Sequence, residues 1–313
     1  MNRLLAVVGS TACGKSAMGL ALAEAFDGEI VSCDSTAVYQ GLDIGTDKTP
    51  VDERRGVPHH LIDVVPPTDV YSAARYASDA AGAVREITAR GRLPILVGGT
   101  GFYFQALVRG LFPGPTRHDE LRDRLNRIAA RRGPEALHRW LGRRDPVSAA
   151  RIMPRDLKRI VRALEVYLLT GRAISDHFDT TVSLIPDYRV LTIGIRMPRP
   201  DLRVRVARRV DEQFTRGVVQ EVEALIAGGM PAASHAFSGL VYRQIIELLG
   251  GVRNEADTRH LIVRENMRYA KRQLKWFRKR PETHWLDGPG ETPAALAAAI
   301  QIVDGFLRGL TID

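Results

Sequence analysis

The chain has 313 residues, of which 45% are hydrophobic and 26% are charged, so we expect a folded globular protein, neither disordered nor fibrous. Its longest apolar runs fall short of the roughly 20 residues that span a bilayer, so we expect no membrane partner, a cytoplasmic location and a monomer. Cys13 and Cys33 have neither disulfide-framework nor metal-ligand spacing, which argues against a disulfide scaffold or structural zinc.

The net charge of +9 is unevenly distributed along the chain. Residues 1–113 have a net charge of −2, whereas residues 117–172 contain 15 basic and 7 acidic residues, and residues 264–280 contain 8 and 1. An excess of this kind fits a solvated, arginine-rich surface as well as it fits a polyanion-binding face. If the basic surface binds a polyanion, the polyanion is most often nucleic acid.

Short apolar runs alternate with helical patterns over the first hundred residues. Uninterrupted apolar residues predict buried strands at 4–8, 29–32, 60–64 and 93–97. Helices are predicted at 16–26 and 72–90, with Ser72 as the N-cap of the second. Buried strands separated by helices indicate βαβ units around a parallel sheet, and therefore an α/β fold.

The pattern changes at residues 111–115, where two prolines and a glycine mark a boundary. The following segment, to about residue 180, is helical and basic, with breaks at Gly133-Pro134, Asp145-Pro146 and Gly171. A strand pattern returns at 190–195, and long helices are predicted at 201–227 and 256–280.

These patterns predict an α/β core interrupted by a helical insertion domain. The first part of the core would occupy residues 1–114, and the basic insertion, a candidate polyanion-binding domain, residues 115–187. The rest of the core, with its C-terminal basic helices, would occupy residues 188–313.

Residues 9–16, GSTACGKS, match the phosphate-loop motif G-x-x-x-x-G-K-[ST] and directly follow the first predicted strand. In this motif backbone N–H groups cradle phosphate oxygens, the lysine adds a charge, and the serine can bind Mg²⁺. The motif therefore indicates a P-loop NTPase-like core with Mg²⁺ as a cofactor, held by Ser16. The candidate diphosphate-binding residues are Gly9, Ser10, Thr11, Ala12, Cys13, Gly14, Lys15 and Ser16.

Two features differ from a standard ATPase. The strand that ends at Val97 continues into Gly98-Gly99-Thr100, without the terminal Asp that usually helps to hold Mg²⁺. Asp34 instead follows the second strand. Because the carboxyl ends of parallel strands face the ligand crevice, Asp34 and Thr100 should face the same site as Lys15. Asp34 could bind metal through water, act as a general base, or cap the turn that follows it.

The chain resembles the bacterial tRNA dimethylallyltransferases in a set of motifs that occur in order along residues 9–276. The motifs are the phosphate loop, Asp34-Ser35, Val38-Tyr39, residues 41–46, Gly98-Gly99-Thr100, Tyr103, Arg159, residues 162–166, Gly239, residues 242–244, residues 271–273 and Trp276. The chain departs from the family pattern at Ser10, where proline is usual, and at Ala37, where many members have glutamine. Neither change removes a group that the chemistry needs.

The resemblance implies transfer of a dimethylallyl group from dimethylallyl diphosphate to N6 of adenosine 37, beside the tRNA anticodon. The phosphate loop would then hold a diphosphate leaving group instead of ATP. The resemblance also implies that Asp34 is the catalytic base and that Lys15, Thr100 and Arg209 act on the diphosphate side. The sequence alone does not distinguish Arg209 from Arg205 and Arg208 on the same predicted helix.

Five basic residues at helical spacing predict a stripe on the helix at 256–280. This basic stripe comprises Arg264, Arg268, Lys271, Lys275 and Arg278. Alone it would fit a solvated face, but the resemblance favours a grip on the tRNA anticodon stem-loop. The resemblance predicts tRNA contacts at Asp34, Ser35, Thr36, Ala37, Thr100, Arg122, Lys158, Arg159, Arg162, Gly239, Tyr242, Arg243, Arg268, Lys271, Arg272, Lys275 and Arg278.

Other interpretations stay open at this point. Trp276 fits base stacking and interior packing equally, and His59-His60 is better explained as structural than as a metal pair. A P-loop small-molecule kinase shares the phosphate loop but leaves the basic segments unexplained. A non-catalytic RNA-binding protein with a structural phosphate leaves Asp34 and Thr100 unexplained. A related enzyme that prenylates free adenine nucleotides would not need the basic insertion.

Overall fold

The computed structural model describes residues 1–310, except the side chain of Asp179. The chain forms two compact units. The first, the core unit, comprises Met1–Val108 and the chain from Leu184 onward; the second, the insertion unit, comprises Arg109–Ser183. Within residues 1–310, no helix combines the length and apolar character needed to cross a bilayer.

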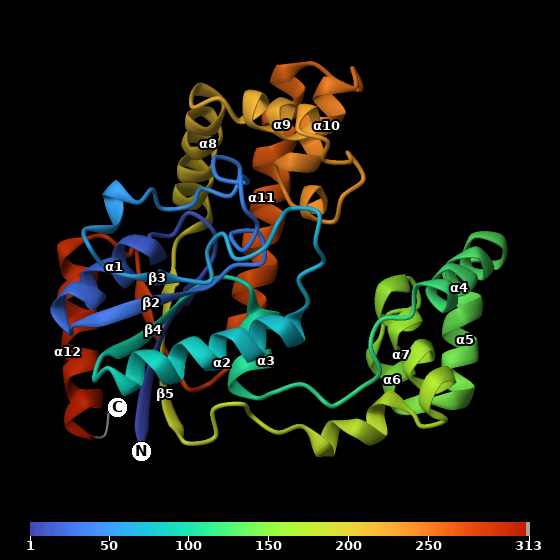
Figure 1. Cartoon of the computed structure of the whole chain (residues 1–313), viewed down its shortest axis with the longest axis horizontal. Helices are drawn as coiled ribbons and strands as arrows, with labels where there is room; N and C mark the ends of the chain where they lie inside the picture. The colour runs from blue at the N-terminus through green and yellow to red at the C-terminus, as the bar shows by residue number, and fades with distance from the viewer. Residues whose placement is uncertain (311–313) are drawn as a thin grey trace. The chain divides into compact units, whose positions relative to one another are not determined.

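A six-stranded, fully parallel sheet forms the centre of the core unit, as predicted for an α/β fold (Figure 1). Its strand order is β3-β2-β4-β1-β5-β6. The strands are β1 (Asn2–Gly9), β2 (Gly28–Cys33), β3 (His59–His60), β4 (Leu93–Gly98), β5 (Tyr188–Arg196) and β6 (Thr283–Asp287). The phosphate loop therefore follows a strand that pairs on both sides, with β4 and with β5.

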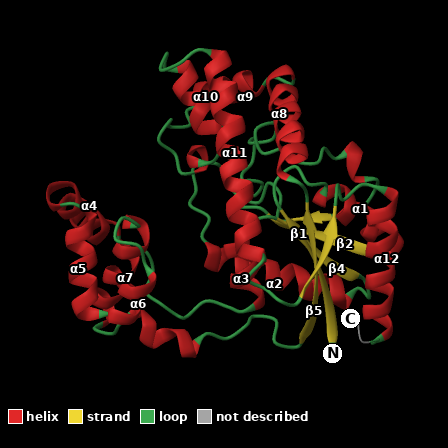
Figure 2. Ribbon diagram, turned by 180° about the vertical axis from the view of Figure 1, so that it is seen from behind, coloured by secondary structure: helices red, strands yellow, loops and turns green. Residues whose placement is uncertain are grey.

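Helices cover both faces of the sheet (Figure 2). On β1, Leu5 and Val7 face α1 (Lys15–Ala25) and α12 (Pro293–Arg308). Leu4, Ala6 and Val8 face α2 (Ala73–Ala89) and α3 (Gly101–Val108). This alternation buries both faces of β1, which explains its continuous apolar run. Ser72 caps α2 by accepting a hydrogen bond from the Arg75 N–H, as predicted.

Four further helices stand beyond the carboxyl edge of the sheet in the core unit. They are α8 (Arg199–Thr215), α9 (Val218–Ala227), α10 (Tyr242–Leu249) and α11 (Glu255–Phe277). Figure 1 shows α11 running from this group down to the sheet. Helix α11 packs against α8 and α10, and it also contacts β1 and α3. One long helix therefore joins the outer group of helices to the end of the phosphate-loop strand.

The structure corrects two predicted elements. The strand predicted at 60–64 is confined to His59–His60, because Leu61 and Asp63 have φ values of 61° and 56° and take the chain out of extended geometry. The helix predicted at 201–227 is two helices, α8 and α9, since Gly217 adopts a φ of 92° between them. The sequence reading also missed α10, β6 and α12.

The insertion unit is helical, as predicted. It contains α4 (Asp119–Arg132), α5 (Pro134–Arg144), α6 (Pro146–Arg151) and α7 (Leu157–Thr170), packed around Leu125, Leu141, Ile160 and Leu164. Its helix breaks at Gly133-Pro134, Asp145-Pro146 and Gly171 were all anticipated. The observed limits are 109 and 183, whereas the sequence placed them at 115 and 187.

A buried carboxylate joins α4 to α7. Glu165 has no exposed side-chain surface and accepts hydrogen bonds from the Arg122 guanidinium (2.8 Å twice), the Arg162 guanidinium (2.7 Å) and the His118 backbone N–H (2.9 Å). Burial raises the pKa of Glu165, but these donors outweigh burial and lower the pKa to about 2. Arg122 and Arg162 therefore hold the insertion together, and their predicted contacts with tRNA stay predictions, since 27% and 31% of their side chains are still exposed.

We expect acid to loosen the insertion unit. Because the pKa of Glu165 falls from 4.5 to about 2 on folding, the stabilisation is complete above pH 4.5 and is lost as the pH falls toward 2. The loss should be on the order of 2 kcal/mol, and Glu165→Gln should remove that part of the pH dependence. Hydrogen exchange of α7, corrected for intrinsic rates, measures it. Identical pH profiles for the two proteins would contradict this account.

Candidate active site

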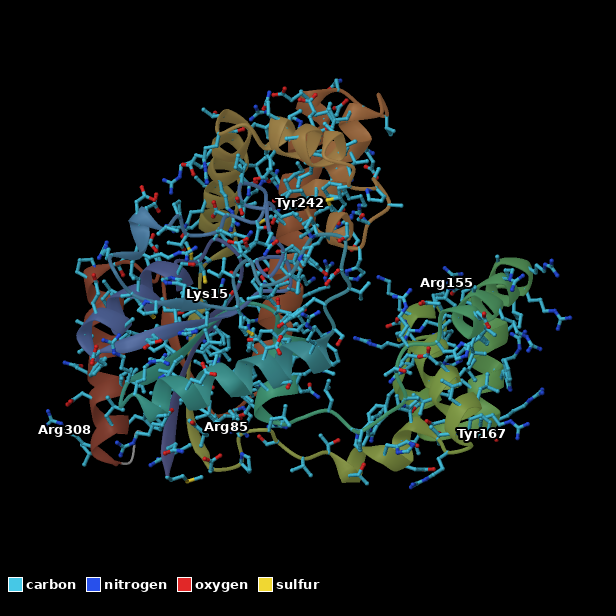
Figure 3. All side chains as sticks on the ribbon, in the orientation of Figure 1. Lys15, Arg85, Arg155, Tyr167, Tyr242 and Arg308 are labelled. Atoms are coloured by element: carbon cyan, nitrogen blue, oxygen red, sulfur yellow. The ribbon has the colours of Figure 1, made fainter. Side chains whose placement is uncertain are left out.

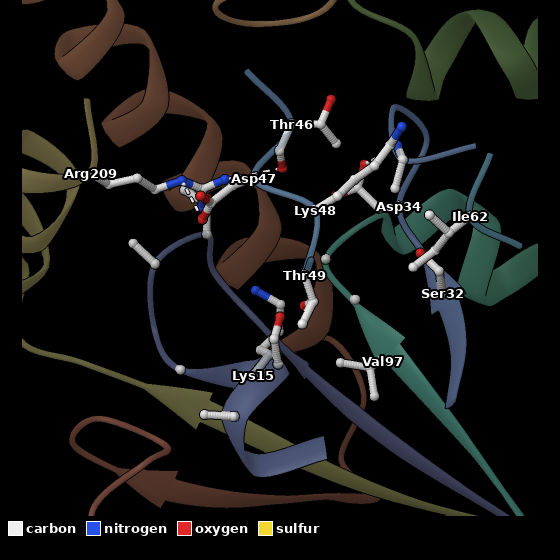
Figure 4. A pocket seen from close by; sticks show the side chains of 18 of the residues that line it. Lys15, Ser32, Asp34, Thr46, Asp47, Lys48, Thr49, Ile62, Val97 and Arg209 are labelled. Atoms are coloured by element: carbon white, nitrogen blue, oxygen red, sulfur yellow. Dashed lines mark hydrogen bonds and ion pairs between the residues drawn. The ribbon is translucent and has the colours of Figure 1, made fainter. Parts of the chain in front are cut away.

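The carboxyl ends of three adjacent strands form the site. The phosphate loop follows β1, Asp34 follows β2, and Thr100 lies just beyond β4. Lys15 and Asp34 line one cavity of about 320 Å³ (Figure 4). Thr100 lies beside this cavity, where its hydroxyl accepts a hydrogen bond from the Ser35 N–H (3.2 Å). The strand-end argument therefore located this site from sequence.

The phosphate loop is held by groups from distant parts of the chain. Lys15 Nζ donates to the Ser10 carbonyl (2.5 Å), across the loop. The Gly290 N–H donates to the Cys13 carbonyl (2.9 Å). At Gly14, φ is 91° and an added Cβ would lie 2.7 Å from the backbone nitrogen of Gly290. Glycine is therefore required at position 14 by both conformation and space.

Two arginines of α8 face the phosphate loop. Arg209 donates to the Thr11 hydroxyl (2.9 Å) and pairs with Asp47 (3.0 Å). Arg205 donates to the Ala12 carbonyl (2.8 Å). Arg208 pairs with Glu212 on the more exposed side of the helix. Arg205 also pairs with Glu291 (2.5 Å). Lys15, Arg205 and Arg209 thus line the cavity with cationic groups, two of them paired with carboxylates, and Arg205 is a site residue that the sequence did not single out.

Asp34 uses one carboxylate oxygen to hold its own loop. Oδ1 accepts hydrogen bonds from the Thr36 N–H (2.8 Å), the Thr36 hydroxyl (2.6 Å) and, at longer range, the Ala37 N–H (3.4 Å). No donor within residues 1–310 reaches Oδ2. Oδ1 thus caps the turn, which is one of the three roles that the sequence left open for Asp34, and Oδ2 stays available to a substrate.

A second cavity, of about 160 Å³, adjoins the first. The two share five lining residues: Thr11, Asp34, Thr46, Arg209 and Tyr269. The second is also lined by Ser35, Thr36, Gly239, Val241 and Asn266. Hydroxyl, amide and apolar groups around a small chamber suit a planar heterocycle. Asp34 therefore lies between a cationic phosphate site and a chamber of mixed polarity.

The inner face of α11 supplies three site residues that sequence reasoning missed: Asn266, Tyr269 and Gln273. Burial and the nearby Asp34 charge raise the pKa of Tyr269 to about 12. Its phenol therefore stays protonated at neutral pH and can donate a hydrogen bond. Polar residues spaced i, i+3 and i+7 on a helix, opposite a basic stripe, were the available signal.

A buried lysine and a half-buried glutamate hold the loop between β2 and β3. Lys48, with 4% of its side chain exposed, contacts Asp43 (2.6 Å) and Asp63 (2.5 Å). Glu221 of α9 accepts hydrogen bonds from the Ile44 N–H (2.7 Å) and the Tyr242 hydroxyl (2.7 Å). Tyr242 is fully buried in this helical group (Figure 3). The residue anchors the loop that carries Thr46, and its predicted contact with tRNA stays a prediction.

All five residues of the basic stripe are exposed on α11. Arg268 pairs with Glu265 (2.6 Å), whereas no acidic side chain within residues 1–310 pairs with Lys271, Lys275 or Arg278. Arg272 lies over the Tyr269 ring, 5.7 Å from its centroid. The stripe is thus a cationic surface with little internal neutralisation.

The remaining predicted residues are divided between surface and interior. Lys158, Arg159 and Arg243 are exposed, although Arg159 pairs with Asp156 (3.0 Å). Trp276 packs against Phe104 and Phe277, which favours the interior interpretation. Ala37 is buried and lines the phosphate cavity. His60 contacts Glu29 (2.6 Å) and His59 the Val57 carbonyl (2.9 Å), so both histidines are structural.

The parallel sheet and phosphate loop define an α/β protein with a P-loop NTPase-like, oligophosphate-binding core. The family model described as IPP transferase matches residues 37–280. The chain belongs to the IPP transferase family and is an enzyme that transfers a group. The resemblance found in the sequence is thereby confirmed.

Individual relatives agree with this assignment. The chain is 44% identical over 304 residues to a tRNA dimethylallyltransferase of Koribacter versatilis, covering 96% of this chain and 97% of that one. It is 46% identical over 285 residues to a tRNA dimethylallyltransferase of Thermomicrobium roseum, covering 91% and 86%.

Solved structures show the same fold. A tRNA isopentenylpyrophosphate transferase of Bacillus halodurans has a TM-score of 0.72 and 35% identity, covering 99% of this chain and 96% of that one. A eukaryotic dimethylallyltransferase described as acting on tRNA has a TM-score of 0.83 and 26% identity, covering 100% and 81%.

Proposed function

We propose that this chain transfers a dimethylallyl group from dimethylallyl diphosphate to N6 of adenosine 37 in tRNA and releases diphosphate. The observation that supports this most directly is the pair of cavities that meet at Asp34. One offers the cationic phosphate loop, and the other offers a chamber suited to a base. The lining of this chamber includes Ser35, Thr36, Val241 and Asn266.

The donor's diphosphate binds the phosphate loop. Lys15, Arg205 and Arg209 face it, and their fixed charges stabilise the negative charge that grows on the leaving group as the carbon–oxygen bond breaks. This stabilisation costs little reorganisation because Arg205 and Arg209 are already held by the loop. The loop thus acts on the departing diphosphate.

Mg²⁺ fits this site as a cofactor held by Ser16. The Ser16 side chain is exposed in the first turn of α1 and lines the cavity next to Lys15. Among the described residues, no group of three His, Cys, Asp or Glu side chains could hold a metal ion. Mg²⁺ commonly retains several waters and binds substrate phosphates, so Ser16 would hold it together with the diphosphate of the donor. When bound, it would neutralise part of the diphosphate charge.

The acceptor amine enters the second chamber and meets Asp34 Oδ2. The N6–carbon bond forms as the carbon–oxygen bond to diphosphate breaks. The bonding electrons leave with diphosphate, and the N6 proton passes to Oδ2. An exocyclic adenine amine is a poor nucleophile, so a base positioned on its proton is worth about 10²–10⁴ in rate. Oδ1 keeps the carboxylate oriented through Thr36.

Adenosine 37 must leave the stacked anticodon loop to reach this chamber, which costs a few kcal/mol. We propose that the basic stripe on α11, together with Lys158 and Arg159 of the insertion unit, offsets this cost through phosphate contacts. We propose that Arg243 and the backbone at Gly239, which lines the second chamber, also contact the tRNA.

The stripe should account for part of the salt dependence of tRNA binding. Each phosphate contact on single-stranded RNA changes the slope of log affinity against log salt by about 0.7. Replacing Arg268, Lys271 and Lys275 together by Ala should therefore flatten the slope by about 2, with little change in rate at saturating tRNA. An unchanged slope in the folded triple variant would make the stripe a solvated face.

Ligand protection tests the donor assignment. A ligand that binds only the folded state raises the melting temperature according to its concentration and affinity. With Mg²⁺, dimethylallyl diphosphate should protect the chain more than ATP does at the same concentration. Stronger protection by ATP would favour the small-molecule kinase.

A further inference from the structure

Gln273 of α11 connects the ends of two sheet strands. Its Oε1 accepts a hydrogen bond from the Thr11 N–H (2.8 Å), and its Nε2 donates to the Gly99 carbonyl (3.0 Å). The side chain is 6% exposed. A Cβ at Gly99 would lie 2.1 Å from Nε2, so the glycine makes room for this amide. Thr11 follows β1 and Gly99 follows β4.

These contacts restrict the phosphate loop from one side. The Thr11 N–H is already occupied by Gln273, so it is not one of the donors free to meet a phosphate oxygen. The Thr11 side chain is held separately by Arg209. Thr11 is therefore fixed through both its backbone and its hydroxyl before any ligand binds. A loop whose donors are already held in place loses less conformational entropy when it binds a ligand.

We propose that Gln273 is a positioning residue that holds the phosphate loop in the conformation that binds diphosphate. It lies on α11, on the face opposite the basic stripe. Gln273 acts through Thr11 and Gly99. The inference rests on the proposed function only for the identity of the ligand as a diphosphate.

Gln273→Met tests the role, because methionine is similar in length to glutamine but has no hydrogen-bond donor and only a weak acceptor. With inorganic diphosphate and Mg²⁺ as the titrant, its affinity should fall about tenfold, the scale expected for losing two neutral hydrogen bonds that orient a site. In transfer assays KM for the donor should rise by a similar factor, with kcat within about threefold of wild type, because the lost effect is on binding. Affinity for tRNA should stay within about twofold.

Gln213→Met is the matched control. Gln213 is also buried, 2% exposed, and its amide donates to the carbonyls of Ile44 and Gly45 (3.2 Å each). It lines the second chamber, so it controls for diphosphate affinity and not for transfer, and its amide bonds carbonyls outside the phosphate loop. It should lose thermal stability much as Gln273→Met does, yet keep diphosphate affinity within about twofold of wild type. Equal losses of affinity in both variants, or wild-type affinity in Gln273→Met, would overturn the proposal.

The two claims fail in distinguishable ways. If the wild-type chain transfers no label to tRNA, the proposed function is wrong, but the diphosphate titration still decides the role of Gln273. If transfer to tRNA occurs and the titrations of wild type and Gln273→Met coincide, the function stands and the positioning role does not.

Discussion

Asp34→Asn should lower the single-turnover rate of transfer by about 10²–10⁴, the range expected for loss of a general base. Asparagine can keep an oxygen acceptor for the Thr36 N–H, which now bonds to Oδ1 (2.8 Å). The loop should therefore stay folded while the position of Oδ2 loses its basicity. Rapid-quench measurement with enzyme in excess isolates this step from product release.

The binding properties of the same variant provide the control. Affinities for diphosphate and for tRNA should remain within a few-fold of wild type, since neither ligand's phosphates depend on this carboxylate. Asp34→Ala should show a similar rate loss and, in addition, a lower melting temperature, because it also removes the cap on Thr36. A near-normal single-turnover rate in Asp34→Asn would remove Asp34 from the role of base.

Lys15→Met should weaken donor capture and slow transfer, together by about 10²–10³ in kcat/KM for the donor. The bound donor and the transition state both place negative charge beside this ammonium group, so the loss should appear in both KM and kcat. Steady-state kinetics with varied dimethylallyl diphosphate at saturating tRNA measures it.

Binding of tRNA without donor should change little in Lys15→Met, because the ammonium group contacts the Ser10 carbonyl within the phosphate loop (2.5 Å). A large loss of donor-free tRNA binding would show that Lys15 serves the RNA. Lys15→Arg tests geometry, because a planar guanidinium does not replace a compact ammonium in a tight backbone cradle.

Local features made much of the site predictable. The phosphate loop has a fixed residue pattern after a buried strand, and strand ends in a parallel sheet meet at one edge. Those two rules predict that Lys15 and Asp34 line one cavity, as they do, with Thr100 close by at the end of the next strand. The helix breaks at Gly217 because this residue adopts a positive φ. A glycine in the sequence allows that conformation but does not require it, so the break was not predicted.

The residues that the sequence missed, and those with an unforeseen structural role, depend on partners that lie far away in sequence. Gln273 faces inward because α11 packs between the sheet and the outer helices, and its acceptor is Gly99, 174 residues away. Arg122 looks like a surface cation until Glu165, 43 residues later, occupies it. Tyr242 likewise belongs to the interior through Glu221. Helical spacing alone does not reveal which polar face will be buried.

The central claim is that Asp34 stands between a diphosphate site and a chamber for one unstacked adenosine. The most direct measurement uses donor labelled in the dimethylallyl group with three acceptors: a tRNA with adenosine 37, the same tRNA with guanosine 37, and AMP. The account predicts label on the first acceptor alone, located on N6 by nucleoside analysis. Comparable labelling of AMP, or of the guanosine 37 tRNA, would contradict it.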